Sequence, residues 1–119
     1  MVTVRELKPR YKFWLETKGG YLFGQGAFDL LQAIQASGSL SAAVKMLKMS
    51  YRYAWGIIKQ IEKNVGEPVL NTYKGGKAGG GGSDLTPMGR ELLATYSRFK
   101  EIFDELCTPE SLNLGTAEK

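Results

Sequence analysis

The sequence contains no histidine and a single cysteine, Cys107. Without histidine, the chain cannot form a Ser-His-Asp triad, an imidazole acid–base catalyst or a histidine-ligated metal site. A lone thiol excludes an internal disulfide and a multi-cysteine metal site. No run approaches ~18 consecutive apolar residues, and charges occupy the N-terminus where a signal peptide is apolar. We therefore expect a cytoplasmic protein with no membrane span, no metal, no cofactor and no enzymatic activity.

Basic side chains are concentrated in the middle of the 119-residue chain. Residues 41–82 contain seven lysines and arginines and two acidic residues, a net charge of +5. Residues 83–119 carry four basic and seven acidic side chains, a net charge of −3. This distribution is expected of a protein that presents one basic face to a polyanion, and a solvated lysine-bearing surface is the alternative.

The apolar spacing and the turn signals predict an α+β fold that is mainly α-helical with small β-hairpins. The expected order is a hairpin with strands 12–16 and 21–23, helices 26–36, 40–47 and 51–64, strands 69–73 and 83–85 around a glycine-rich loop 74–82, and a long helix 86–107. Ser39 and Ser50 are expected to cap two of the helices, and Gly66 is expected to end one. This order is typical of a winged helix-turn-helix domain over residues 1–107, followed by a flexible tail, 108–119.

The two helices on either side of the tight turn Lys48-Met49 form the unit that places a helix in the DNA major groove. Arg52 can contact guanine, and Gly56 permits a close approach. Lysines in the glycine-rich loop can contact phosphate. The predicted DNA-binding residues are Ser39, Ser41, Ser50, Tyr51, Arg52, Tyr53, Gly56, Lys59, Lys74, Gly75, Gly76 and Lys77. An ordinary helical hairpin and a loop with incidental lysines are the alternatives.

The last helix contains apolar residues at spacings of four, three, four and three. This heptad-like stripe consists of Leu92, Tyr96, Phe99, Phe103 and Leu106. It is wide for so small a chain to cover, so we predict that it forms the interface of a homodimer. Packing within the monomer is the alternative. Trp55, which lies beside apolar positions of helix 51–64, is expected mainly in the core.

Five tracts resemble the N-terminal DNA-binding domain of the molybdate-responsive ModE regulators. They are residues 38–44 (GSLSAAV), 49–55 (MSYRYAW), 66–70 (GEPVL), 75–82 (GGKAGGGG) and 85–89 (LTPMG). The first two tracts also resemble LysR-type winged helices, whereas the glycine-rich tract followed by L-T-P-x-G is more specific. The resemblance covers about residues 20–106 and implies a dimeric, sequence-specific transcriptional regulator that binds double-stranded DNA. The two-fold symmetry of such a dimer predicts an inverted-repeat operator.

This chain departs from the family pattern in two respects. Full-length members carry a C-terminal molybdate-binding domain, whereas this chain ends soon after the long helix, so molybdate sensing is doubtful. Lys48 occupies the turn position where glycine is usual. If the turn residue is left-handed, a lysine there costs ~1 kcal/mol. Non-specific chromatin-type DNA binding, or an oxyanion-binding or protein-interaction module, are the alternative functions.

Overall fold

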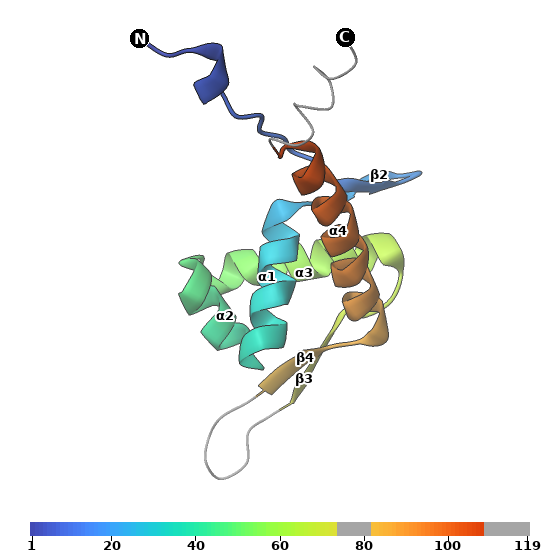
Figure 1. Cartoon of the computed structure of the whole chain (residues 1–119). Helices are drawn as coiled ribbons and strands as arrows, with labels where there is room; N and C mark the ends of the chain where they lie inside the picture. Colours follow the sequence, from blue (N-terminus) through green and yellow to red (C-terminus); the bar gives the residue numbers. More distant parts are fainter. Residues whose placement is uncertain (74–81, 109–119) are drawn as a thin grey trace.

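The computed structural model describes residues 1–73 and 82–108, in which four α-helices and two antiparallel hairpins form an α+β fold (Figure 1). The elements are η1 (Val4–Glu6), β1 (Leu15–Thr17), β2 (Gly20–Phe23), α1 (Gln25–Ser37), α2 (Leu40–Leu47), α3 (Tyr51–Val65), β3 (Leu70–Tyr73), β4 (Gly82–Leu85) and α4 (Pro87–Leu106). This order confirms the α+β class and the predicted sequence of helices and hairpins.

Local capping chemistry sets the helix boundaries. The Ser39 hydroxyl accepts the Ala42 N–H at 3.1 Å, and the Ser50 hydroxyl accepts the Tyr53 N–H at 3.0 Å. Each bond satisfies a backbone donor that the first helical turn leaves free. At the other end of α3, Gly66 has a φ of 83°, a left-handed conformation that glycine adopts without a side-chain clash. The predicted caps are therefore confirmed.

The turn between α2 and α3 is left-handed at Lys48, with φ 56° and ψ 39°. Its N–H donates to the carbonyl of Lys45 at 3.3 Å, and the Met49 N–H donates to the carbonyl of Val44 at 3.1 Å. These bonds close the end of α2 and allow α3 to start at Tyr51, two residues after Met49. The lysine keeps the conformation that glycine would adopt, at a cost of ~1 kcal/mol.

Helix α1 is the centre of the core and contacts α2, α3, α4, β2 and β4. Its buried residues include Leu30, Leu31 and Ile34, which are fully enclosed. The hairpin β3–β4 is joined to the end of α1 by the Ser83 N–H, which donates to the carbonyl of Gly38 at 2.9 Å. In Figure 1, this hairpin extends away from the helices, on the side opposite the N-terminal segment.

The first hairpin is shorter than predicted. β1 begins at Leu15 instead of residue 12, and the pairing register shifts between Leu15 and Glu16. The physical reason is that Phe13 packs on α4, with its ring centre 4.3 Å from that of Tyr96. Residues 12–14 therefore follow α4 instead of pairing with β2.

Candidate nucleic-acid interface

Helix α3 has one buried face and one exposed face. Ala54, Ile58 and Ile61 are buried in the core. The exposed face of α3 consists of Arg52, Gly56, Lys59, Gln60 and Lys63, which recur at helical spacing. An α-helix with its side chains is 10–12 Å across, which matches the ~12 Å major groove of B-form DNA.

The exposed face of α3 carries three basic side chains, and Glu62, the one acidic residue of this helix, is paired with only one of them. The Oε2 atom of Glu62 accepts the Val69 N–H at 3.0 Å, and its Oε1 atom lies 3.9 Å from Lys59 Nζ. The same ammonium group lies 5.3 Å from the ring centre of Trp55, a cation–π contact. Lys59 is thus paired with Glu62, whereas no ion pair is observed for Arg52 or Lys63 within the described residues.

Aromatic residues flank the start of α3. Tyr51 and Tyr53 are 50% and 63% exposed, and Trp55 is half-buried against the core. The ring centres of Tyr51 and Trp55 lie 6.3 Å apart in an edge-to-face arrangement. The expected core position of Trp55 is therefore only partly realised, because its ring is shared between the core, Tyr51 and Lys59.

The serines predicted to bind DNA lie at the starts of α2 and α3. Ser41 and Ser50 are exposed, and Ser39 is half-buried. Ser39 and Ser50 use their oxygen atoms as helix caps, which leaves each hydroxyl hydrogen available to another acceptor. Lys74, Gly75, Gly76 and Lys77 lie outside the described residues. Tyr73 pairs with Gly82, and these two residues are the last described ones at that end of the β3–β4 hairpin.

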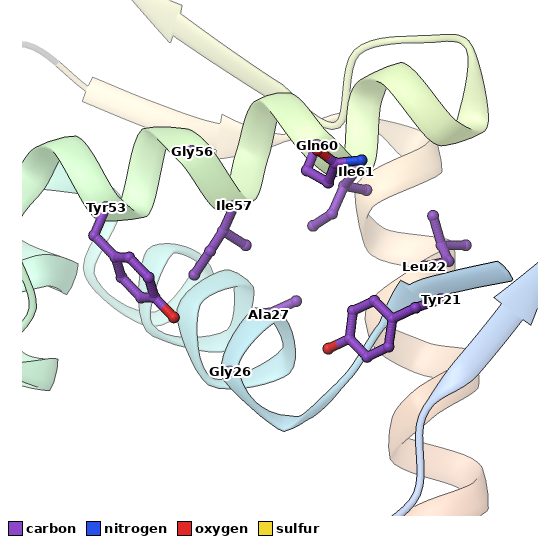
Figure 2. A pocket seen from close by; sticks show the side chains of 9 residues that line it. All are labelled: Tyr21, Leu22, Gly26, Ala27, Tyr53, Gly56, Ile57, Gln60 and Ile61. Atoms are coloured by element: carbon purple, nitrogen blue, oxygen red, sulfur yellow. The ribbon is translucent and has the colours of Figure 1, made fainter.

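A hollow of about 490 Å³ lies beside α3, between it, β2 and the first turn of α1. Its floor is apolar and includes Leu22, Ala27 and Ile61, while Tyr21, Tyr53 and Gln60 form its rim. Figure 2 shows the rings of Tyr21 and Tyr53 on opposite sides of the opening. Sequence patterns gave no signal for this hollow, because it combines residues more than thirty positions apart.

The glycines of this hollow keep it open. A Cβ atom built at Gly26 or at Gly56 would meet no other atom within 4 Å. Glycine therefore relieves no clash at either position; it leaves space beside the apolar floor. At Gly56, this space lies on the exposed face of α3.

The apolar stripe predicted on the last helix is divided between the core and the surface. Tyr96 is only 1% exposed, and its hydroxyl donates to Gln25 Oε1 at 3.1 Å. Burial raises its pKa. Phe103 is half-buried, and its ring centre lies 5.3 Å from that of Tyr11 and 4.9 Å from that of Phe13. Tyr96 is thus a core residue of the single chain, contrary to its predicted place in a subunit interface.

The remaining apolar surface near α4 forms a patch, which we call the α4 patch. Leu92 is half-buried against the core, whereas Phe99 and Leu106 are exposed. Trp14 and Ile102, which the stripe did not include, are also exposed, at 50% and 46%. The α4 patch is defined by Trp14, Phe99, Ile102 and Leu106. Trp14 lies 85 positions from Phe99 in the sequence, so periodicity alone could not find it.

The described residues contain no group of three or more His, Cys, Asp or Glu side chains that could hold a metal ion. Cys107 is half-buried at the end of α4. None of the helices in residues 1–73 and 82–108 combines the length and apolar character needed to cross a bilayer.

Comparison with known proteins finds relatives whose names refer to molybdenum or to transcriptional regulation. The chain is similar to part of the ModE and MopB proteins. It is 38% identical over 101 residues to the molybdenum-pterin-binding protein MopB of Rhodobacter capsulatus, covering 83% of this chain and 37% of that protein. It is 40% identical over 96 residues to the transcriptional regulator ModE of Haemophilus influenzae, with coverages of 74% and 37%.

A third relative is the DNA-binding transcriptional dual regulator ModE of Escherichia coli. The chain is 34% identical to it over 92 residues, which cover 74% of this chain and 35% of that protein. The chain therefore spans little more than a third of the length of these curated relatives. No family model matches the chain.

Proposed function

We propose that this chain is a winged helix-turn-helix domain that binds double-stranded DNA sequence-specifically and regulates transcription as a homodimer. Helix α3 enters the major groove, and the tip of hairpin β3–β4 lies on the backbone or in the adjacent minor groove. Residues 1–107 form the DNA-binding domain, and α4 contributes to dimerisation. Such a protein acts in the cytoplasm, in association with the nucleoid. It needs neither a cofactor nor catalytic residues.

The observation that carries this proposal is the exposed face of α3. Arg52 and Lys63 project from it without an ion pair in the described residues, and Glu62 is held by the backbone of Val69. A basic helix of this kind, preceded by a short helix and a tight turn, fits the docking geometry of a recognition helix. The ModE relatives named as DNA-binding or transcriptional regulators support the same function.

The remaining predicted contacts are assigned by position. Ser39, Ser41 and Ser50 lie at the helix starts, where hydroxyl and backbone N–H groups bind phosphate. Tyr51 and Tyr53 begin α3, whose first residues contact base edges in this motif. Lys74 and Lys77 supply positive charge where the tip of hairpin β3–β4 meets the DNA. Gly75 and Gly76 allow the protein backbone to approach the phosphates closely.

The homodimer is assigned to the α4 patch together with the half-buried Leu92 and Phe103. An isologous interface is self-complementary, so an exposed apolar strip on one helix can cover its own copy. Two-fold symmetry then predicts an inverted-repeat operator whose half-sites lie about one helical turn, or a multiple, apart. Molybdate sensing is not assigned to these residues, because the matched part covers only 37% and 30% of two relatives that have molybdenum in their names.

Selection of bound sequences from random duplexes, with and without molybdate, tests the proposal. We expect enrichment of an inverted repeat that footprinting shows to be protected on both half-sites. Equal affinity for scrambled duplexes would indicate a non-specific chromatin-type protein instead. No binding to any duplex at moderate salt would reject DNA binding and favour an oxyanion-binding or protein-interaction module.

A further inference from the structure

Gln60 offers an unengaged amide on the exposed face of α3. It is exposed, lies one turn after Gly56, and has no hydrogen-bond partner within the described residues. A glutamine amide combines a carbonyl acceptor with an NH₂ donor. That pair matches the N6 amino group and the N7 atom of adenine in the major groove.

The other polar groups of this face cannot make the same contact. Arg52 and Lys63 only donate hydrogen bonds, which suits guanine O6 and N7 or phosphate. Lys59 also only donates, and its ammonium group lies 5.3 Å from the ring centre of Trp55 and 3.9 Å from Glu62 Oε1. Gln60 is thus the one side chain of the exposed face that can both donate to and accept from a base.

An apolar space lies directly beside this amide. Gly56, Ile57 and Gln60 all line the hollow between α3, β2 and α1 (Figure 2). Ile57 is half-buried, and a Cβ atom built at Gly56 would meet no other atom within 4 Å, so the surface of α3 is open at Gly56. An apolar surface is what the 5-methyl group of thymine contacts in the major groove.

We propose that Gln60 and the mouth of this hollow together read one A·T base pair. The Gln60 amide pairs with adenine N6 and N7, and the thymine 5-methyl group enters beside Gly56 and Ile57. This proposal rests on the proposed DNA-binding function. Gln60 follows Arg52 by eight residues, a rise of ~12 Å along α3. The A·T pair is therefore expected about three to four base pairs from the base that Arg52 contacts.

Parallel selections from random duplexes with the wild type, Gln60→Ala and Gln32→Ala test the amide contact. Gln32 is an exposed glutamine on α1, outside the hollow, and serves as the matched control. The wild type and the control should select A·T at one position of each half-site. Gln60→Ala should lose that preference, a discrimination of about 5- to 150-fold, and keep the preference set by Arg52.

Replacing thymidine by deoxyuridine at the selected position tests the methyl contact, because the exchange removes that one group. The dissociation constant should rise about fourfold for the wild type, as expected for one lost methyl group. The same exchange at an unselected position should leave affinity unchanged. The Gln60→Ala variant should remain sensitive to the exchange, since the hollow is intact.

The outcomes separate this inference from the proposed function. A wild-type selection that enriches an inverted repeat, with an unchanged profile in Gln60→Ala, would overturn the reading by Gln60 and leave DNA binding intact. Insensitivity to deoxyuridine would overturn the role of the hollow. A wild type that enriches no sequence would remove the proposed function and this inference together.

Discussion

Helices α3 and α4 are both long, amphipathic and rich in aromatic residues, yet they place these residues differently. On α3, Tyr51 and Tyr53 point outward among basic side chains. On α4, Tyr96 is buried, and the exposed aromatic residue, Phe99, lies among other apolar groups. The two helices therefore present surfaces that suit different partners.

This contrast arises from what packs against each helix. The N-terminal segment runs along the end of α4, where the Tyr11 hydroxyl donates to Asp104 and to the carbonyl of Lys100. No described segment covers the exposed face of α3 in the same way. A polar face can stay solvated until a polyanion binds, whereas an apolar strip is stabilised by being covered.

The largest expected effect is on stability and separates a buried from an exposed tyrosine. Tyr96→Ala should lower the free energy of unfolding by about 3–5 kcal/mol, because it removes a large ring from the core. Tyr53→Ala should cost less than ~1 kcal/mol, because its ring is mostly in water. Urea denaturation of both variants measures this. Equal losses would show that the two helices do not differ as described.

The next effect concerns the α4 patch. Ile102→Ser should weaken the homodimer by about 1.5–3 kcal/mol per covered side chain, because each copy loses apolar area. Glu101→Ser, at an adjacent exposed position, is the control and should leave association unchanged. Sedimentation equilibrium measures both. An unchanged association constant for Ile102→Ser would place the interface elsewhere.

Base reading by α3 can be separated from the positive charge that Lys77 supplies. Arg52→Ala should cost about 1–3 kcal/mol in binding and relax specificity at one base. Lys77→Ala should weaken binding to all sequences and reduce the salt dependence by about one phosphate contact. Fluorescence anisotropy over a range of salt concentrations distinguishes them. An equal loss on every sequence for Arg52→Ala would reject its base-reading role.

A smaller effect tests whether Gly56 allows α3 to approach the DNA closely. Gly56→Ala and Gly26→Ala should each raise the free energy of unfolding by about 0.5–1 kcal/mol, because alanine favours the helix and neither Cβ meets another atom. DNA affinity should fall more for Gly56→Ala than for Gly26→Ala, because Gly56 lies on the exposed face of α3, whereas Gly26 only lines the hollow from α1. Full affinity in both variants would contradict a close approach at Gly56.

The smallest effect is a pH dependence at the end of α4. Burial and the hydrogen bond to Asp104 raise the pKa of Tyr11 to about 12. The contribution of Tyr11 to the free energy of unfolding is therefore complete below pH ~10, the pKa of an unfolded tyrosine. This contribution is lost as the pH rises toward 12. Tyr11→Phe should flatten the fall of stability over this interval. Part of the fall in stability should remain in Tyr11→Phe, because the pKa values of Tyr73 and Tyr96 are also raised.

The helices of this fold were predictable because their signals are local. Ser39 and Ser50 cap the residues that follow them directly, and the left-handed turn at Lys48 involves neighbours in sequence. The exposed face of α3 was predictable for the same reason, since helical spacing places Arg52 and Gly56 opposite the buried residues.

The stripe on α4 was not predictable in the same way. Tyr96 and Phe99 obey the same spacing, but one is buried and the other exposed. What separates them is Phe13, which stacks on Tyr96 from 83 residues away. The hollow beside Gly56 depends likewise on Tyr21 and Leu22 of a hairpin far from α3 in sequence.

By itself, the sequence determined where each helix begins and ends and which side of α3 remains polar, because caps and periodicity act over a few residues. Only the tertiary structure decided which aromatic residues of α4 stay exposed and that a hollow opens beside Gln60. These outcomes depend on contacts between distant segments, whose positions no local pattern encodes.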